Sequence, residues 1–263
     1  MNIQFSFRRF WHVLVWTLVY HWRQLLTLFS VAVIAFLVAE IPDFIQVSND
    51  YAYRILNHES HETIVSDALH TAGNSCMSFL LVLMCVGAVF AFFHLHRKNE
   101  GRRLLMLPAT NLEKFLARWV VYVPVLFVLY VVAFMVADVV RMAVWPVLVS
   151  SPKISFPTAI PEFFGVMKYL VVWTSTLHFY KLLALWRKFW LFHALSLFSS
   201  VWIGRWAWLF VTMVFFAVTA LLLRGNYQGW DVTVFYLLAV VLAIAAYWLF
   251  CRFPKYKLFH NKD

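Results

Sequence analysis

The residues that could carry chemistry in this chain are few and scattered. His58, Glu59, His61 and Glu62 lie within one polar stretch, and the two histidines could share a helical face as metal ligands. A tetrahedral metal site needs four ligands, and the stretch lacks the fourth partner. We therefore interpret it as an outward-facing, solvated loop rather than a metal site.

Other histidines could in principle hold a haem between helices. A haem needs two facing histidines at matched depth in the membrane. The candidates are His94, His96, His178 and His193. His94 and His96 fall at the end of the apolar segment 75–94. His178 lies nearer the middle of the segment 169–185, and His193 lies beyond that segment. Because these depths do not match, we expect no cofactor, and we interpret His178 as a packing or hydrogen-bonding residue between helices.

The sequence lacks the motifs of several large enzyme classes. It contains no Gly-rich phosphate-binding loop ending in Lys-Ser or Lys-Thr, no Gly-x-Ser-x-Gly and no His-Glu-x-x-His. We therefore expect that the chain is not an enzyme and does not hydrolyse ATP by itself.

Asp138 and Arg141 are charged residues at the end of an apolar segment. Charges inside a membrane are costly and often functional. Spaced three residues apart, the two side chains can pair on one helical face, and both could reach the interface. We favour an anchoring role over a role in substrate binding.

Composition points to a membrane as the environment of these residues. The chain is 63% hydrophobic and only 13% charged, against about 25% charged in soluble domains. A single compact domain cannot hide that much apolar surface from water. The net charge of +10 is dispersed in short patches between apolar runs, a pattern of membrane loops rather than of nucleic-acid binding.

Six apolar runs have the length needed to cross a bilayer, so we predict an all-α, polytopic membrane protein with one transmembrane domain over residues 1–263. The predicted spans are residues 25–41, 75–94, 119–140, 169–185, 206–223 and 232–250. Residues 189–204 form a shorter apolar stretch that is either an interfacial lead-in to the fifth span or the fifth span itself. Residues 5–22 are predicted to form an amphipathic helix in the interface, or alternatively to extend the first span.

Lysine and arginine set the predicted orientation. With six spans, 17 of the 22 Lys and Arg lie on the side of both termini, while nine of the 12 acids lie on the other side. Because the basic side of a membrane protein faces the cytoplasm, both termini are predicted to be cytoplasmic.

The cytoplasmic loop at residues 94–118 is the most informative segment. Thr110 and Glu113 have the spacing of a capping box, and Pro108 stops any earlier helix, so a helix should begin at about Asn111. Exposed leucines beside basic residues suggest a docking surface for a cytoplasmic partner. The predicted docking residues are Arg102, Arg103, Leu104, Leu105, Leu107, Thr110, Glu113 and Lys114.

Three segments resemble the type 2 ABC transporter permeases, especially small six-helix bacterial members. LLMLPATNLEKFLARW at 104–119 is similar to their first cytoplasmic loop, LLALWRKFWLFHA at 182–194 to their fourth helix, and YWLFCRFPKYKL at 247–258 to their last helix and basic tail. The N-terminal helix resembles their elbow helix. The resemblance implies a permease subunit in the bacterial inner membrane, working as a homo- or heterodimer with a separate cytoplasmic ATPase.

We therefore expect a transport permease whose loop 97–118 transmits closure of an ATPase to the second and third spans. The alternative is a membrane scaffold or assembly factor that does not transport. A membrane-embedded enzyme or haem protein is the least favoured reading, because the catalytic inventory is so thin.

Overall fold

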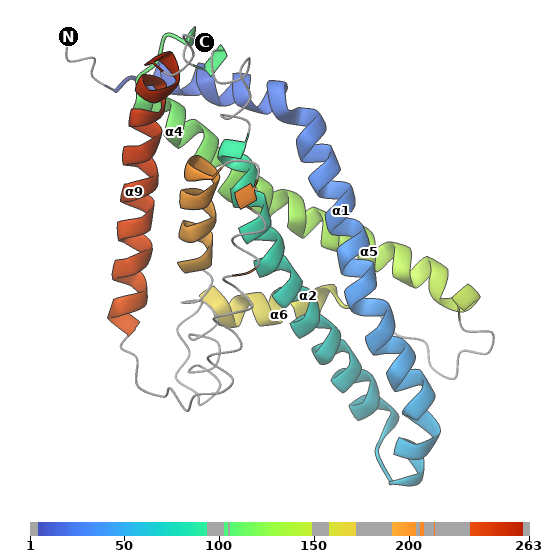
Figure 1. The fold of residues 1–263 in the computed structure, drawn as a ribbon. Helices are drawn as coiled ribbons and strands as arrows, with labels where there is room; N and C mark the ends of the chain where they lie inside the picture. Colours follow the sequence, from blue (N-terminus) through green and yellow to red (C-terminus); the bar gives the residue numbers. More distant parts are fainter. Residues whose placement is uncertain are drawn as a thin grey trace. The chain divides into compact units, whose positions relative to one another are not determined.

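The computed structural model describes residues 5–93, 103–104, 106–148, 158–171, 191–203, 206–207, 213 and 232–259 (Figure 1). Within these ranges the regular structure is entirely helical, which confirms the predicted all-α class. The labelled elements are α1 (Phe7–Leu56), α2 (His61–Phe93), α4 (Asn111–Val120), η2 (Val121–Val125), α5 (Leu126–Leu148), α6 (Ile160–Val171) and α9 (Val232–Phe259). A further helix spans Leu191–Trp202.

Three helical stretches in the described part of the chain are long and apolar enough to cross a membrane, and they run over Phe7–Leu56, His61–Phe93 and Asn111–Pro146. They contain the first three predicted spans apart from His94, which lies outside the described residues, and α9 contains the last one, at 232–250. The predicted spans at 169–185 and 206–223 lie largely outside the described residues, so the count of six stays a prediction.

Helix α1 differs from the expectation of a separate interfacial helix at residues 5–22. It continues without a break from Phe7 to Leu56, through Pro42. The backbone therefore agrees with the alternative, in which these residues extend the first span, and a distinct amphipathic helix is not confirmed.

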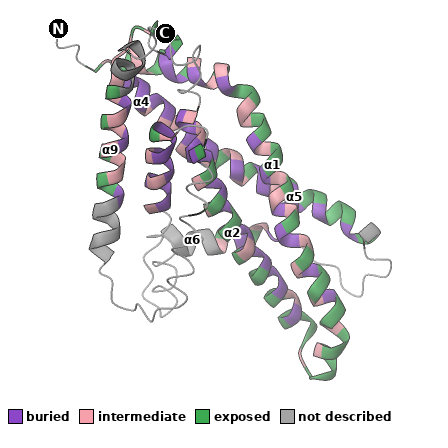
Figure 2. Ribbon diagram, in the orientation of Figure 1, coloured by how far each residue is buried: buried purple, intermediate pink, exposed green. Residues whose placement is uncertain are grey.

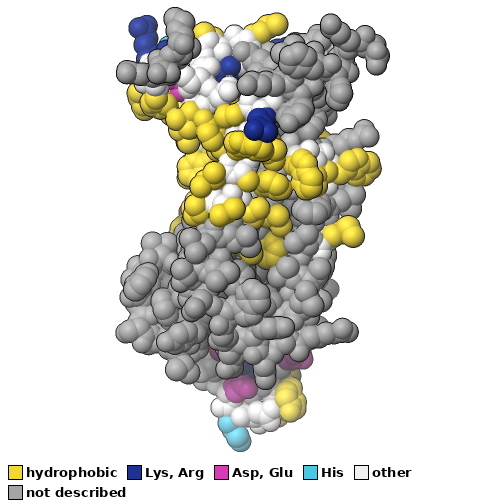
Figure 3. All heavy atoms as spheres, turned by 60° about the vertical axis from the view of Figure 1, so that its left-hand side comes forward, with side chains coloured by type: hydrophobic (Ala, Val, Ile, Leu, Met, Phe, Trp, Pro, Cys, Tyr) yellow, Lys and Arg dark blue, Asp and Glu magenta, His cyan; other side chains and the backbone are white. Residues whose placement is uncertain are grey.

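Valines on α5 show how these helices meet their surroundings. Val128, Val132, Val136 and Val139 recur every three or four residues and are all exposed. Figure 2 shows that buried and exposed residues also alternate along α1 and α2. In Figure 3, hydrophobic side chains gather over the upper part of the face in view, among the residues drawn in colour. Apolar stripes of this kind suit lipid as the surrounding solvent.

The helices divide into two compact units. The first unit comprises 1–23, 84–127 and 184–263, and the second comprises 24–83 and 128–183. Helices α1 and α2 contribute residues to both.

Aromatic side chains form the core of the first unit. Phe115 of α4 stacks on Phe92 of α2, with ring centroids 5.1 Å apart, and meets Tyr247 and Phe250 of α9 at 5.4 and 5.6 Å. Offset and edge-on ring pairs at these separations add to the stability that burial provides. One residue of α4 is thereby packed against two other helices.

The helix that follows α4 widens into a π turn at η2, where Pro124 stands. Proline has no N–H to donate, and its ring would crowd the carbonyl four residues earlier in an ordinary α-helix. In the widened turn the N–H of Leu126 donates to the carbonyl of Val121, five residues back. The wider turn lets the helix pass the proline without ending.

The second unit packs α1, α2, α5 and α6 around buried rings. Phe134 of α5 lies 4.0 Å from Phe163 of α6 and 5.6 Å from Phe36 of α1. At Gly73, α2 lies close to α6: a Cβ there would be 3.4 Å from the backbone carbonyl carbon of Glu162, about van der Waals contact, so any further side-chain atoms would press on the backbone of α6.

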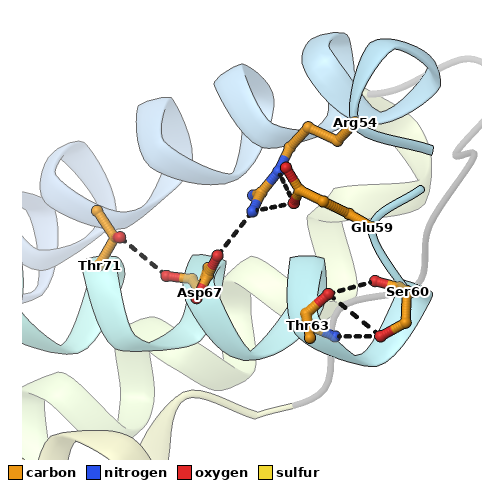
Figure 4. A network of polar contacts seen from close by, with 6 residues as sticks. All are labelled: Arg54, Glu59, Ser60, Thr63, Asp67 and Thr71. Carbon is orange, nitrogen blue, oxygen red and sulfur yellow. Dashed lines mark hydrogen bonds and ion pairs between the residues drawn. The ribbon is translucent and has the colours of Figure 1, made fainter. Parts of the chain in front are cut away.

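A short turn, Asn57–Ser60, joins α1 to α2 in the second unit (Figure 4). Arg54 donates to Glu59 and to Asp67, each at 2.6 Å, and Ser60 accepts from the N–H of Thr63 at 3.2 Å. His58 adopts a positive φ of 64° in this turn. His58 and His61, the pair considered above as metal ligands, are both exposed here.

The close approach at Gly73 gives a stability prediction. Gly73→Leu should destabilise the second unit by about 1–3 kcal/mol, because the new side chain meets the backbone of α6, which cannot move aside cheaply. Gly165→Leu, on α6, is the matched control, since a Cβ there has no atom within 4 Å. Thermal unfolding in detergent should show a loss only for the first variant. Equal unfolding temperatures for the two variants would contradict the close packing.

Candidate functional site

The structure places the predicted docking residues in different environments. Arg103 is exposed, and its Nη1 donates to the hydroxyl of Tyr20 on α1 at 3.0 Å. The expectation of an exposed Leu104 is wrong, because only 1% of its surface is exposed. Leu107 and Thr110 are half-buried, while Glu113 and Lys114 are buried. Arg102 and Leu105 lie outside the described residues.

Met106 is the docking candidate that the sequence reasoning missed. Its side chain is 80% exposed, more than any other large hydrophobic residue in the described part of the chain. Hydrophobic character alone favours the neighbouring leucines, but Leu104 is buried and the exposed side chain is that of Met106. An exposed, flexible methionine is well suited to contact a partner protein.

Glu113 is the centre of a polar cluster in the first unit. The capping box predicted for α4 is present: Thr110 accepts from the N–H of Glu113 at 3.2 Å, and the N–H of Thr110 donates to Glu113 Oε2 at 2.8 Å. The helix begins at Asn111, as the sequence predicted. This arrangement fixes where the loop ends and the long helix begins.

The same carboxylate holds the start of α1. Glu113 Oε1 accepts from the backbone N–H of Ser6 at 2.7 Å and from Arg9 Nη2 at 3.1 Å. The Glu113 side chain is fully buried, and that of Arg9 is 36% exposed. Burial tends to raise the pKa of the carboxyl, but the hydrogen bonds from Arg9, Ser6 and Thr110 outweigh it and lower the pKa below its ordinary value. Glu113, which precedes the predicted span at 119–140, therefore keeps its charge.

Arg118 joins α4 to α2. Its Nη1 donates to the carbonyl of Ala91, in the last turn of α2, at 2.9 Å, and the side chain is 1% exposed. The last-turn carbonyls of a helix have no partner inside it and carry partial negative charge. A buried guanidinium is a strong partner for such a carbonyl. The first two turns of α4 are thus fixed to α1 by Glu113, to α2 by Arg118 and to α9 by Phe115.

A second polar cluster lies in the second unit, around Asp138. Arg141 donates to Asp138 Oδ1 through Nε at 3.0 Å and Nη2 at 2.6 Å, which confirms that the two residues pair on one helical face. Asp138 Oδ2 accepts from the hydroxyl of Thr158 and from the N–H of Ala159, the latter at 3.1 Å. The exposed fractions are 0% for Asp138 and 1% for Arg141. The expectation that they reach outward to the interface is therefore wrong.

Glu40 of α1 completes this cluster. Its Oε2 lies 3.3 Å from Arg141 Nε, and its Oε1 accepts from the thiol of Cys76 at 3.4 Å. The guanidinium also lies over the ring of Phe44, 4.3 Å from its centroid. Sequence reasoning counted Glu40 only as one acid on the outer side. The signal that it is special is its position inside an apolar helix, where an ionisable residue needs a partner.

The remaining candidates carry no site in the described part of the chain. His193 is buried, and His94, His96 and His178 lie outside the described residues. No group of three or more His, Cys, Asp or Glu could hold a metal ion among the residues searched.

The Glu113 cluster gives a second prediction, on stability. Glu113→Ala should destabilise the folded chain by about 2–4 kcal/mol, because it removes the cap and leaves Arg9 and the Ser6 N–H without their acceptor. Glu113→Gln should cost less, since glutamine can still close a capping box. Unfolding in detergent measures both variants. Glu62→Ala, an exposed acid in the first turn of α2, serves as the matched control and should cost little.

A double-mutant cycle with Arg9→Ala separates the ion pair from the cap. Arg9→Ala should destabilise the wild type but have little further effect on Glu113→Gln, because the pair is already broken there. Additive losses would contradict a direct Arg9–Glu113 interaction.

Comparison with known proteins found no matching family model, no matching curated protein and no matching solved structure.

Proposed function

We propose that the chain is the membrane permease subunit of an ATP-driven transporter, and that a separate cytoplasmic ATPase docks on the segment that precedes α4. In this proposal six helices cross the inner membrane, both termini lie in the cytoplasm, and the subunit pairs with a second permease. The resemblance of 104–119 to the first cytoplasmic loop of type 2 ABC permeases supports the assignment.

The observation that carries the proposal is the way the docking segment is anchored. The exposed Arg103 and Met106 lie a few residues before α4, whose first two turns are tied to α1, α2 and α9. Displacement of a partner bound at Met106 would therefore act on three helices at once. A loop that served only as a positively charged topology signal would need none of these contacts.

The proposed mechanism is a population shift between inward-open and outward-open arrangements. ATP binding would close the ATPase dimer and favour the arrangement whose docking segments fit the closed form. No bond is made or broken by this chain. Its contribution is to transmit a displacement through short hydrogen bonds and packed rings, which deform little.

A docking variant tests this proposal. Met106→Asp should reduce capture of the ATPase by about tenfold or more, because a charge replaces apolar contact at the centre of the interface. Leu56→Asp is the matched control, since Leu56 is 77% exposed at the end of α1 in the second unit. The measurement is a pull-down from detergent with expression matched, scoring only a subunit that carries a phosphate-binding loop.

Two outcomes would count against the permease. If the wild type captures no ATPase, or if Met106→Asp captures it as well as Leu56→Asp does, the docking idea fails. Reproducible capture of a partner complex that lacks a phosphate-binding loop would instead favour the scaffold or assembly factor.

The orientation is tested separately by reporter fusions. Fusions after Ser60 and Ile160 should report the outer side, and fusions after Leu105 and His260 the cytoplasm, because 17 of the 22 basic residues lie on the side of the termini in the six-span arrangement. A cytoplasmic signal from the Ser60 fusion would reverse the orientation.

A further inference from the structure

The Glu40–Asp138–Arg141 cluster of the second unit holds more negative than positive charge. Two carboxyl groups, both 0% exposed, share one guanidinium among the described side chains. The rings of Phe44 and Trp145 are also buried, with centroids 6.2 Å apart, and Phe44 lies against the guanidinium. A buried charge without full compensation is costly, and in proteins such a group neutralises instead of staying charged.

The hydrogen bonds show which of the two carboxyl groups has too few donors to hold the excess negative charge. Asp138 accepts from two nitrogens of Arg141, from the Thr158 hydroxyl and from the Ala159 N–H. Four donors thus occupy the two oxygens of that carboxyl group. Among the described residues, Glu40 accepts only from a thiol, which is a weak donor, and its buried Oε2 has no hydrogen-bond partner there.

The geometry of Arg141 explains this difference. Its Nε carries a single hydrogen, and that hydrogen is donated to Asp138 Oδ1 at 3.0 Å. Glu40 Oε2 lies 3.3 Å from the same nitrogen but receives no hydrogen bond from it. The guanidinium thus attracts Glu40 electrostatically while its directed bond at this nitrogen goes to Asp138.

We propose that Glu40 is a proton-binding site, which holds a proton on Oε2 at neutral pH and couples its uptake and release to the packing of α1 against α2 and α5. An O–H bond forms at Oε2 with a proton taken from water, and the carboxyl becomes neutral. A metal cation is a poor alternative, because Arg141 Nε, 3.3 Å from the same oxygen, would repel it.

In the part of the chain that the structure describes, few groups around Glu40 could titrate in its place. Helix α5 presents Asp138 and Arg141, α2 presents the Cys76 thiol, and Asp43 stands three residues further along α1. Thr158 and Ala159, which lead into α6, direct their donors to Asp138. Both oxygens of Asp138 already accept hydrogen bonds, from four donors in all, and an arginine keeps its charge throughout the physiological range. The proton therefore belongs to Glu40. The site is separate from the docking segment and does not depend on the transport proposal.

The sign of the expected pH dependence follows from proton counting. A glutamate in the unfolded chain loses its proton above about pH 4.3. The folded chain then binds one proton more than the unfolded chain, so the stability of the wild type falls as the pH rises. In Glu40→Gln the amide stands in for the protonated carboxyl, and this contribution to the pH dependence disappears.

The test uses the full-length chain purified in detergent. The unfolding temperature of Glu40→Gln should rise relative to that of the wild type by about 3 °C per pH unit between about pH 5 and about pH 7. Glu62→Gln, which changes an exposed glutamate on α2, should follow the wild type at every pH. Infrared spectra of the wild type at neutral pH should show the carbonyl stretch of a protonated carboxyl group, and this band should be absent from Glu40→Gln.

Three results would overturn the proposal. The first is the absence of a protonated-carboxyl band from the wild type at neutral pH, which needs no variant. The second is a band that persists in Glu40→Gln, since the proton would then reside elsewhere. The third is a Glu40→Gln chain that fails to fold, or is less stable than the wild type across the pH range, as loss of a needed negative charge would cause.

Discussion

A carboxylate removed from water must receive hydrogen bonds or an opposite charge, and each unit of this chain is organised around one that does. In the first unit Glu113 accepts from Ser6, Arg9 and Thr110. In the second, Asp138 accepts from Arg141, Thr158 and Ala159. Several kcal/mol of desolvation are at stake for each ion. The chain segments that carry these donors are therefore held in place, and so are the helices that pack against them.

The local half of each cluster could be read from the sequence. Thr110 and Glu113 stand three residues apart, and so do Asp138 and Arg141, so a helical turn alone brings each pair together. The start of α4 at Asn111 and the pairing of Asp138 with Arg141 were predictable for this reason. The membrane-crossing length of α1, α2 and the α4–α5 stretch follows equally directly from apolar runs.

The distant half could not be read in this way. Arg9 is 104 residues from Glu113 in the chain, and Glu40 lies on a different helix from Arg141. No periodicity relates such positions, so the sequence alone predicts Glu40 only as one acid on the outer side. The exposure of the docking residues could not be predicted for a related reason. A short stretch before a helix has no regular period, and hydrophobic character alone could not tell the buried Leu104 from the exposed Met106.

The two clusters differ in a way that bears on function. Glu113 receives backbone donors from Ser6 and Thr110, which are fixed by the fold, so its charge is stabilised for as long as the fold persists. Such a group suits a permanent joint between α1 and α4. Glu40 receives one weak donor, the thiol of Cys76, and no directed hydrogen bond from Arg141 Nε, so it has few hydrogen bonds to lose when it takes up a proton. A group that can change its charge at little cost in geometry suits a switch. The two carboxyl groups therefore differ in how many hydrogen bonds they lose on protonation. Glu113 would lose several and stays fixed, whereas Glu40 would lose few and can change its charge.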